Sequence, residues 1–163
     1  MPDEAFAAVE PGSGNRNACS PIVDSDFVGI VISAPKKVLF TPGTRDPVSG
    51  AFARFMICGA YRLDAWQLHQ LGGFREGARL VATDADRHDV FTGAMQPPHP
   101  ATPQPDPPRW TAQDFAGQTE QAYFNENLLD FLPLPQQPAR YDVVVTFGSH
   151  GSNVVTVTLE AAR

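Results

Sequence analysis

Residues 138–159 read Pro-Ala-Arg-Tyr-Asp-Val-Val-Val-Thr-Phe-Gly-Ser-His-Gly-Ser-Asn-Val-Val-Thr-Val-Thr-Leu. Two runs dense in Val and Thr flank a Gly/Ser turn, a pattern typical of a β-hairpin. Tyr141 opens the first run directly after a corner that contains proline. The stretch therefore predicts two antiparallel strands and points to a β-rich fold.

This corner resembles the end of bacterial immunoglobulin-like and fibronectin-like sandwich modules. An apolar corner at 132–135, a turn at 136–138, Tyr141 and an alternating strand follow the order found in those families. The resemblance covers residues 120–160. It implies that Tyr141 is a corner tyrosine whose hydroxyl bonds backbone a few residues upstream. The resemblance further implies a role in adhesion, inhibition or scaffolding. It identifies no active-site residue in this chain.

Strand patterns recur along the rest of the chain, at residues 27–33, 36–41, 51–61, 79–83, 88–95 and 118–125. Asp64 to Leu71 predicts a short helix, with Asp64 as N-cap and Gly72-Gly73 as its stop. Residues 97–108 contain seven prolines, which favour an extended loop. We expect an all-β fold: an immunoglobulin-like antiparallel β-sandwich of about eight strands with one short helix and a long Pro-rich loop.

Two of these strands carry information about their neighbours. Residues 36–41 lie between Pro35 and Pro42, which suits an edge strand because proline cannot donate to a sheet. Residues 51–61 are apolar on both faces. They predict a central strand covered on both sides, or one whose far face is roofed by a loop.

For domain organisation, we expect an irregular N-terminal arm at residues 1–25 and a single β-sandwich domain at 26–163. Met1 to Glu4 lack the basic and apolar regions of a signal peptide. The sequence leaves two localisations open, a cytoplasmic protein and the mature form of an exported one. Cys19 and Cys58 allow one disulfide or two buried thiols, and the spacing does not choose between them.

The charge limits the classes of partner. The formal net charge is −6 and only 18% of residues are charged. Because phosphate binding needs a basic stripe, nucleic acid and anionic membranes are not expected partners. No apolar run approaches the roughly 18 residues of a membrane helix. We expect a protein partner or self-association, with carbohydrate as a further possibility.

No group of residues forms a recognisable catalytic or cofactor motif. The segment from Asp84 to Asp89 superficially resembles a calcium loop, but it lacks the required Gly and Glu and reads as an Asp-rich turn. Ser149, His150 and Ser152 lie in a hairpin loop without a nucleophile elbow. We therefore expect no cofactor, no metal site and no catalytic residue, and the sequence favours a non-enzymatic protein over an enzyme.

The expected binding residues are Arg109, Trp110 and His99, on or beside the Pro-rich loop. Trp and Arg are the residue types most often found at binding hot spots. Trp110 either anchors a strap across the sandwich or is presented to a partner. The sequence predicts a non-enzymatic β-sandwich module for protein–protein interaction or assembly; the alternative is a carbohydrate-binding or hydrolase-accessory domain that uses Trp110 and adjacent loops.

Overall fold

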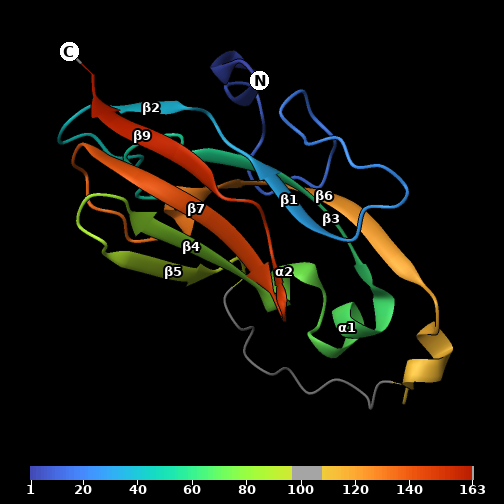
Figure 1. Cartoon of the computed structure of the whole chain (residues 1–163). Coiled ribbons are helices and arrows are strands. Elements are labelled where there is room, and N and C mark those ends of the chain that lie inside the picture. Colours follow the sequence, from blue (N-terminus) through green and yellow to red (C-terminus); the bar gives the residue numbers. More distant parts are fainter. Residues whose placement is uncertain (97–107, 163) are drawn as a thin grey trace.

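The computed structural model describes residues 1–96 and 108–162. In this part of the chain the fold is mostly β, with strands in two sheets that share one core (Figure 1). The strands are β1 (Gly29–Ser33), β2 (Lys37–Phe40), β3 (Met56–Asp64), β4 (Ala78–Asp84), β5 (Val90–Ala94), β6 (Thr119–Asn127), β7 (Ala139–Phe147), β8 (His150–Gly151) and β9 (Val155–Ala161). The helical segments are α1 (Ala65–Gln70), α2 (Phe74–Gly77), η1 (Asp3–Phe6), η2 (Ala112–Phe115) and η3 (Leu128–Asp130).

One sheet has the strand order β1-β3-β6, and the other has the order β2-β9-β7-β4-β5, with β8 paired to β7. The predicted all-β sandwich is confirmed at this level. The expectation of purely antiparallel pairing is wrong at one place, because β2 pairs with β9 in parallel. Hydrogen bonds on one side only make β2 an edge strand, as Pro35 and Pro42 predicted.

The closing hairpin forms where the Val/Thr pattern predicted it. β7 pairs with β9 in antiparallel register, and its side chains alternate between buried and partly exposed. The buried set faces the other sheet because successive side chains of a strand point to opposite faces. Residues 139–161 therefore form the middle of the larger sheet.

Tyr141 is fully buried in this hairpin, but the expected corner hydrogen bond is not formed. Its hydroxyl has no hydrogen-bond partner among the described residues. Its ring packs edge-on against Phe91 of β5, with the centroids 6.1 Å apart. Tyr141 thus fills the core as an aromatic residue, and burial raises the pKa of its hydroxyl.

The central strand β3 is covered on both faces, as its apolar pattern predicted. One face contributes Ile57 and Leu63 to the core between the sheets. The other face carries Met56 and Cys58, which form a second small core with the N-terminal segment through Phe6, Val9 and Cys19. The strand begins at Met56 and not at residue 51, because the backbone N–H of Phe55 bonds the side chain of Asn127 instead of a strand.

The N-terminal segment is joined to β3 by a disulfide between Cys19 and Cys58. Of the two alternatives that the sequence left open, the structure has the bonded pair. Further along the segment, the Asp3 carboxylate accepts from the backbone N–H groups of Lys36 and Lys37, at 2.9 and 3.3 Å. Asp3 therefore caps the start of the edge strand β2, which is one way in which proteins protect sheet edges.

The predicted short helix is present as α1, and the Asp64 side chain accepts from the backbone N–H of Gln67 at 2.9 Å. A second one-turn helix, α2, follows directly and was not expected, because Gly72-Gly73 read as a stop. The glycine pair instead forms a tight link, with φ of 79° and 107°. Positive φ values of this kind favour glycine over other residues.

Candidate binding site

The structure places two of the three expected binding residues. Trp110 is 50% exposed, and Arg109 beside it is exposed as well. His99 and most of the Pro-rich loop lie outside the described residues. The Trp110 ring packs edge-on against Phe115 of η2, with the centroids 6.1 Å apart. Trp110 is thus neither buried as an anchor nor isolated in solvent.

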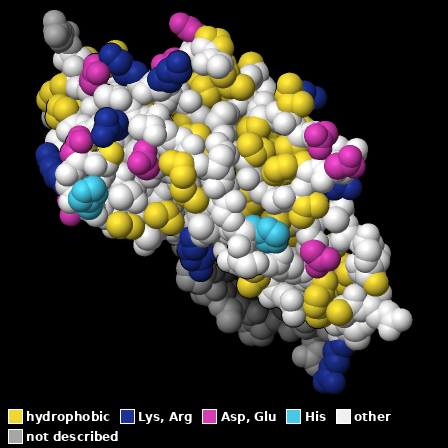
Figure 2. Space-filling model, viewed as in Figure 1, with side chains coloured by type: hydrophobic (Ala, Val, Ile, Leu, Met, Phe, Trp, Pro, Cys, Tyr) yellow, Lys and Arg dark blue, Asp and Glu magenta, His cyan; other side chains and the backbone are white. Residues whose placement is uncertain are grey.

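Three more rings lie next to Trp110 at the end of the sandwich that holds α1 and η2. Phe115 stacks on His69 at 5.1 Å between centroids, and His69 stacks on Trp66 at 5.5 Å. Trp66 and Phe115 are 5.8 Å apart, which closes the group. At this end, Figure 2 shows hydrophobic side chains at the surface beside charged ones. We call Trp66, His69, Trp110 and Phe115 the aromatic surface.

Local hydrogen bonds hold the two short helices that carry these rings. The Asp64 cap starts α1, and Trp66 and His69 share one face of α1 because they are three residues apart. Thr111 and Asp114 form a capping box around η2, in which the Asp114 carboxylate accepts from the Thr111 N–H and hydroxyl at 2.7 and 2.8 Å. The same bonds lower the pKa of Asp114. The rings are therefore held by a preorganised backbone.

A hollow of about 420 Å³ opens beside the aromatic surface. Its lining includes His69, Phe115 and Glu120, with Gly72 and Gly73 on the far side. The Glu120 carboxylate accepts from the hydroxyl of Tyr61 at 2.9 Å. Burial, and then the bond to Glu120, raise the pKa of Tyr61. The hollow thus offers ring faces together with an exposed carboxylate.

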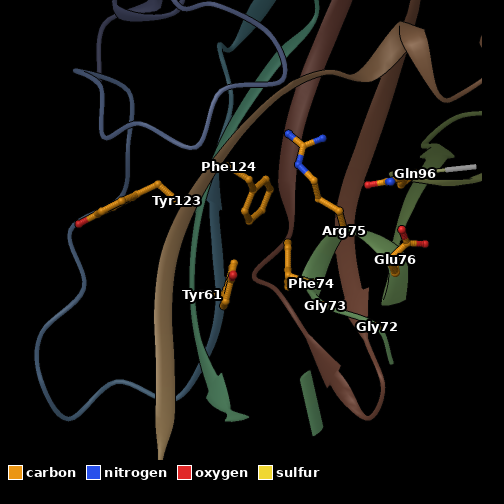
Figure 3. A pocket seen from close by; sticks show the side chains of 9 residues that line it. All are labelled: Tyr61, Gly72, Gly73, Phe74, Arg75, Glu76, Gln96, Tyr123 and Phe124. Carbon is orange, nitrogen blue, oxygen red and sulfur yellow. The ribbon is translucent and has the colours of Figure 1, made fainter. Parts of the chain in front are cut away.

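A second hollow, of about 310 Å³, adjoins the first, since Gly72 and Gly73 line both. Figure 3 shows Tyr61, Phe74 and Phe124 gathered in its wall, with the Arg75 side chain extending beside them from α2. Tyr61 and Phe74 are stacked at 4.1 Å between centroids. The second hollow therefore combines aromatic rings with the polar side chains of Arg75, Glu76 and Gln96.

Arg75 links this hollow to a buried carboxylate. Its guanidinium forms an ion pair with Glu126 of β6, which is 2% exposed. Removal from water raises the pKa of Glu126 to about 7, although the positive charge of Arg75 acts in the opposite direction. The pair ties α2 to β6.

Four acidic side chains of this part of the chain form hydrogen bonds or ion pairs within the fold. Asp114 caps η2, Glu120 bonds Tyr61 and Glu126 pairs with Arg75. Asp130 accepts from the amide of Asn127 at 3.1 Å. Each of these acids thus holds a local element of the structure.

The Asp-rich segment forms the expected turn. The buried Asp84 carboxylate accepts from the backbone N–H groups of Asp86 and Arg87, both at 2.9 Å, which lowers its pKa. In residues 1–96 and 108–162, no three or more His, Cys, Asp or Glu side chains are placed to hold a metal ion.

The loop from Gly148 to Ser152 is the turn of the closing hairpin, as expected. The Ser152 hydroxyl accepts from the Val145 N–H at 3.0 Å and donates to the Asn153 carbonyl at 2.8 Å. It therefore stabilises the hairpin. As to membranes, none of the helices that the structure describes has the length and apolar character needed to span a bilayer.

Sequence reasoning missed His69 and Phe115. The sequence could have placed Trp66 and His69 side by side, since they lie at helical spacing just after the Asp64 cap. Nothing local linked α1 to η2, because their contact depends on how β3 and β6 pair.

Comparisons with protein-family models, with curated proteins and with solved structures each return no significant match.

Proposed function

We propose that this chain is a non-enzymatic β-sandwich module that binds a protein partner through the aromatic surface. The observation that carries the proposal is Trp110, which is half exposed and supported by three further rings at one end of the sandwich. Trp and Arg dominate binding hot spots, and such residues act best where neighbours hold them in place. Arg109 next to Trp110 adds the second of these residue types.

The strand order supports an immunoglobulin-like kind of sandwich. Reading β3 and β6 as strands B and E, and β9-β7-β4 as strands G-F-C, reproduces neighbours of that fold. Two features depart from the pattern. The disulfide joins β3 to the N-terminal segment and not to β7, and the Tyr141 hydroxyl lacks its corner bond.

Carbohydrate binding is the second candidate, and a specific observation favours it. The Trp66, His69 and Phe115 rings lie within 36° of parallel, beside a hollow that contains the Glu120 carboxylate. Ring faces with a nearby hydrogen-bond acceptor suit a sugar, whose two faces are apolar and whose rim is polar.

The disulfide also bears on the compartment. Such bonds persist mainly in oxidising environments. We propose that the chain works in an exported form, of the two forms that its sequence allowed.

The test uses Trp110→Ala with Leu39→Ala as its matched control. Leu39 lies on β2, far from the aromatic surface in sequence, and is 58% exposed, so both variants remove an exposed apolar side chain. Immobilised wild-type protein captures candidates from source cells, and each is then purified and titrated; a glycan array tests sugars. We expect Trp110→Ala to weaken binding about 30-fold, as loss of a hot spot does, and Leu39→Ala to leave it unchanged.

Both variants are expected to keep the melting temperature of the wild-type protein, because neither side chain is buried. The proposal would be wrong if Trp110→Ala and the wild-type protein bound the purified partner or sugar with equal affinity. If a sugar requires Trp110 for binding and no protein does, the carbohydrate alternative is established.

A further inference from the structure

Strand β6 forms one edge of the smaller sheet, and within residues 1–96 and 108–162 most of that edge pairs with no further strand. β6 pairs with β3 along its whole length. Among the described residues, its opposite side meets the N-terminal segment near Asn125, through a bridge to Ser13 and side-chain bonds of Asn125 to Ser13 and Asn15. At the bridge the N–H of Asn125 donates to Ser13 at 3.1 Å, and the carbonyl of Asn125 accepts from Gly12 at 2.7 Å. Gly14 also lies against the Tyr123 carbonyl, so the unpaired stretch of the edge runs from Thr119 to the Tyr123 N–H. The edge is therefore able to pair with an extended chain.

The direction of the remaining backbone groups follows from this bridge. In an antiparallel pair, alternate residues turn both their N–H and their C=O away from the partner strand. Since Asn125 points outward, Thr119, Gln121 and Tyr123 do so too. Among residues 1–96 and 108–162, none forms a backbone hydrogen bond with these outward groups. A row of unpaired donors and acceptors of this kind is a template for another strand.

The second hollow lies directly beside this edge. Phe124 faces the core and lines the hollow, whereas the Tyr123 side chain points away from the other lining residues in Figure 3. A strand laid along β6 would turn every second side chain toward the hollow, because strand side chains alternate. Tyr61, Phe74 and Phe124 would surround the incoming side chain, which favours a large apolar residue.

The free edge also leads to the aromatic surface. η2 carries Phe115 and runs into the start of β6, where Glu120 lines the first hollow. The two hollows meet at Gly72 and Gly73. A chain paired with β6 would therefore continue from the second hollow toward Trp110.

We propose that the partner is bound as an extended peptide that adds a strand to the free edge of β6 and inserts one large apolar side chain into the second hollow. This deepens the proposed function and rests on it. Peptide addition to sheet edges takes affinity from backbone hydrogen bonds and specificity from pockets for alternate side chains. The peptide must lack proline where it faces Gln121 and Tyr123, because proline has no N–H to donate.

A second copy of this chain is a poorer occupant of the site. If β6 of another molecule paired with this edge, its inward positions would present Glu120, Ala122 and Phe124, and Phe124 is already packed in the core of its own molecule. A carboxylate and a methyl group do not fill an aromatic hollow. A partner segment that carries a large apolar residue satisfies both the edge and the hollow.

The test begins with selection from a random 12-residue phage-displayed peptide library on the full chain, followed by titration of the selected synthetic peptides. The diagnostic variant is Gln121→Pro, which removes one outward N–H at an exposed position, and its matched control is Gln121→Ala, which keeps that N–H. We expect Gln121→Pro to weaken binding about tenfold or more and Gln121→Ala to leave it within about twofold, since one backbone bond and its register are lost.

Amide hydrogen exchange on the wild-type protein provides a readout that needs no variant. Bound peptide should slow exchange at Gln121 and Tyr123, whose N–H groups have no backbone partner in the described part of the chain. It should change Ala122 little, because its N–H already faces β3. The inference is overturned if selection yields no peptide, if exchange at Gln121 and Tyr123 is unaffected, or if Gln121→Pro and Gln121→Ala bind alike. It is also overturned if the protein dimerises and Gln121→Pro abolishes the dimer, because the occupant is then a second copy.

Trp110→Ala separates this inference from the proposed function. Peptides that need the β6 edge but tolerate Trp110→Ala would uphold strand addition and remove the aromatic surface. Peptides that need Trp110 but tolerate Gln121→Pro would do the reverse.

Discussion

Replacing Cys19 and Cys58 together by alanine removes the covalent link between the N-terminal segment and β3. The bond closes a loop with a sequence separation of 39 residues. In the chain-entropy treatment, a cross-link over such a loop removes roughly 13 cal/mol/K from the unfolded chain, so its loss costs about 4 kcal/mol near room temperature. That is a large share of the roughly 5–15 kcal/mol that stabilises a typical domain.

The assay is equilibrium unfolding in urea of three samples: the oxidised wild-type protein, the reduced wild-type protein and the double alanine variant. The reduced sample isolates the cross-link, because both sulfur atoms stay in place. The variant in addition loses packing in the small core with Phe6, Val9 and Met56. We expect the reduced protein to lose about 3–4 kcal/mol, and the variant to lose somewhat more.

Amide exchange then locates the effect. Without the bond, we expect faster exchange in residues 1–20 than in the β4–β7 pairs, because the N-terminal segment is then held by noncovalent contacts such as Asp3 with Lys36 and Ser13 with Asn125. If the reduced protein unfolds within about 1 kcal/mol of the oxidised one, the loop-entropy argument is refuted for this chain.

Three further predictions concern the core. Tyr141→Phe should leave the free energy of unfolding in urea unchanged or raise it by up to about 1 kcal/mol, because the variant removes a buried hydroxyl without a partner among the described residues. A clear loss of stability would show that this hydroxyl is bonded. Gly59→Ala should cost about 1–3 kcal/mol in the same assay, since its Cβ would lie 2.0 Å from the ring of buried Phe124, whereas Gly151→Ala, where the added Cβ meets nothing within 4 Å, is the neutral control. Because burial raises the pKa of Glu126 from 4.5 to about 7, the folded state keeps a proton that the unfolded chain releases between these values. Stability should therefore fall by up to roughly 3 kcal/mol as the pH rises from about 4.5 to 7 and then level off, and Glu126→Gln should flatten that profile; equal pH profiles would contradict the assignment.

The strands were largely predictable from local sequence, because their signal is an alternation that each segment carries itself. The Val/Thr runs of the closing hairpin, the prolines beside β2 and the two apolar faces of β3 all predicted what the structure contains. The helix cap at Asp64 was readable for the same reason, since a cap involves residues only three positions apart.

The candidate site was predictable only at Trp110 and Arg109, where a proline-rich segment meets an aromatic residue. His69 and Phe115 join them through contacts between α1 and η2, which are far apart in the chain. The corner hydrogen bond of Tyr141 came from a resemblance, and the packing around the hydroxyl does not provide the bond.

The sequence by itself thus determined the β class, most strand positions and the exposed edge at β2, since these depend on side-chain alternation and on the missing N–H of proline. Tertiary structure decided whether Cys19 and Cys58 bond, that β2 runs parallel to β9, and that Arg75 meets Glu126. It also decided that β1 and β6 form the two edges of the smaller sheet. Each of these depends on the pairing of strands that are remote in sequence, and that pairing is set by the burial of the whole core rather than by any local pattern.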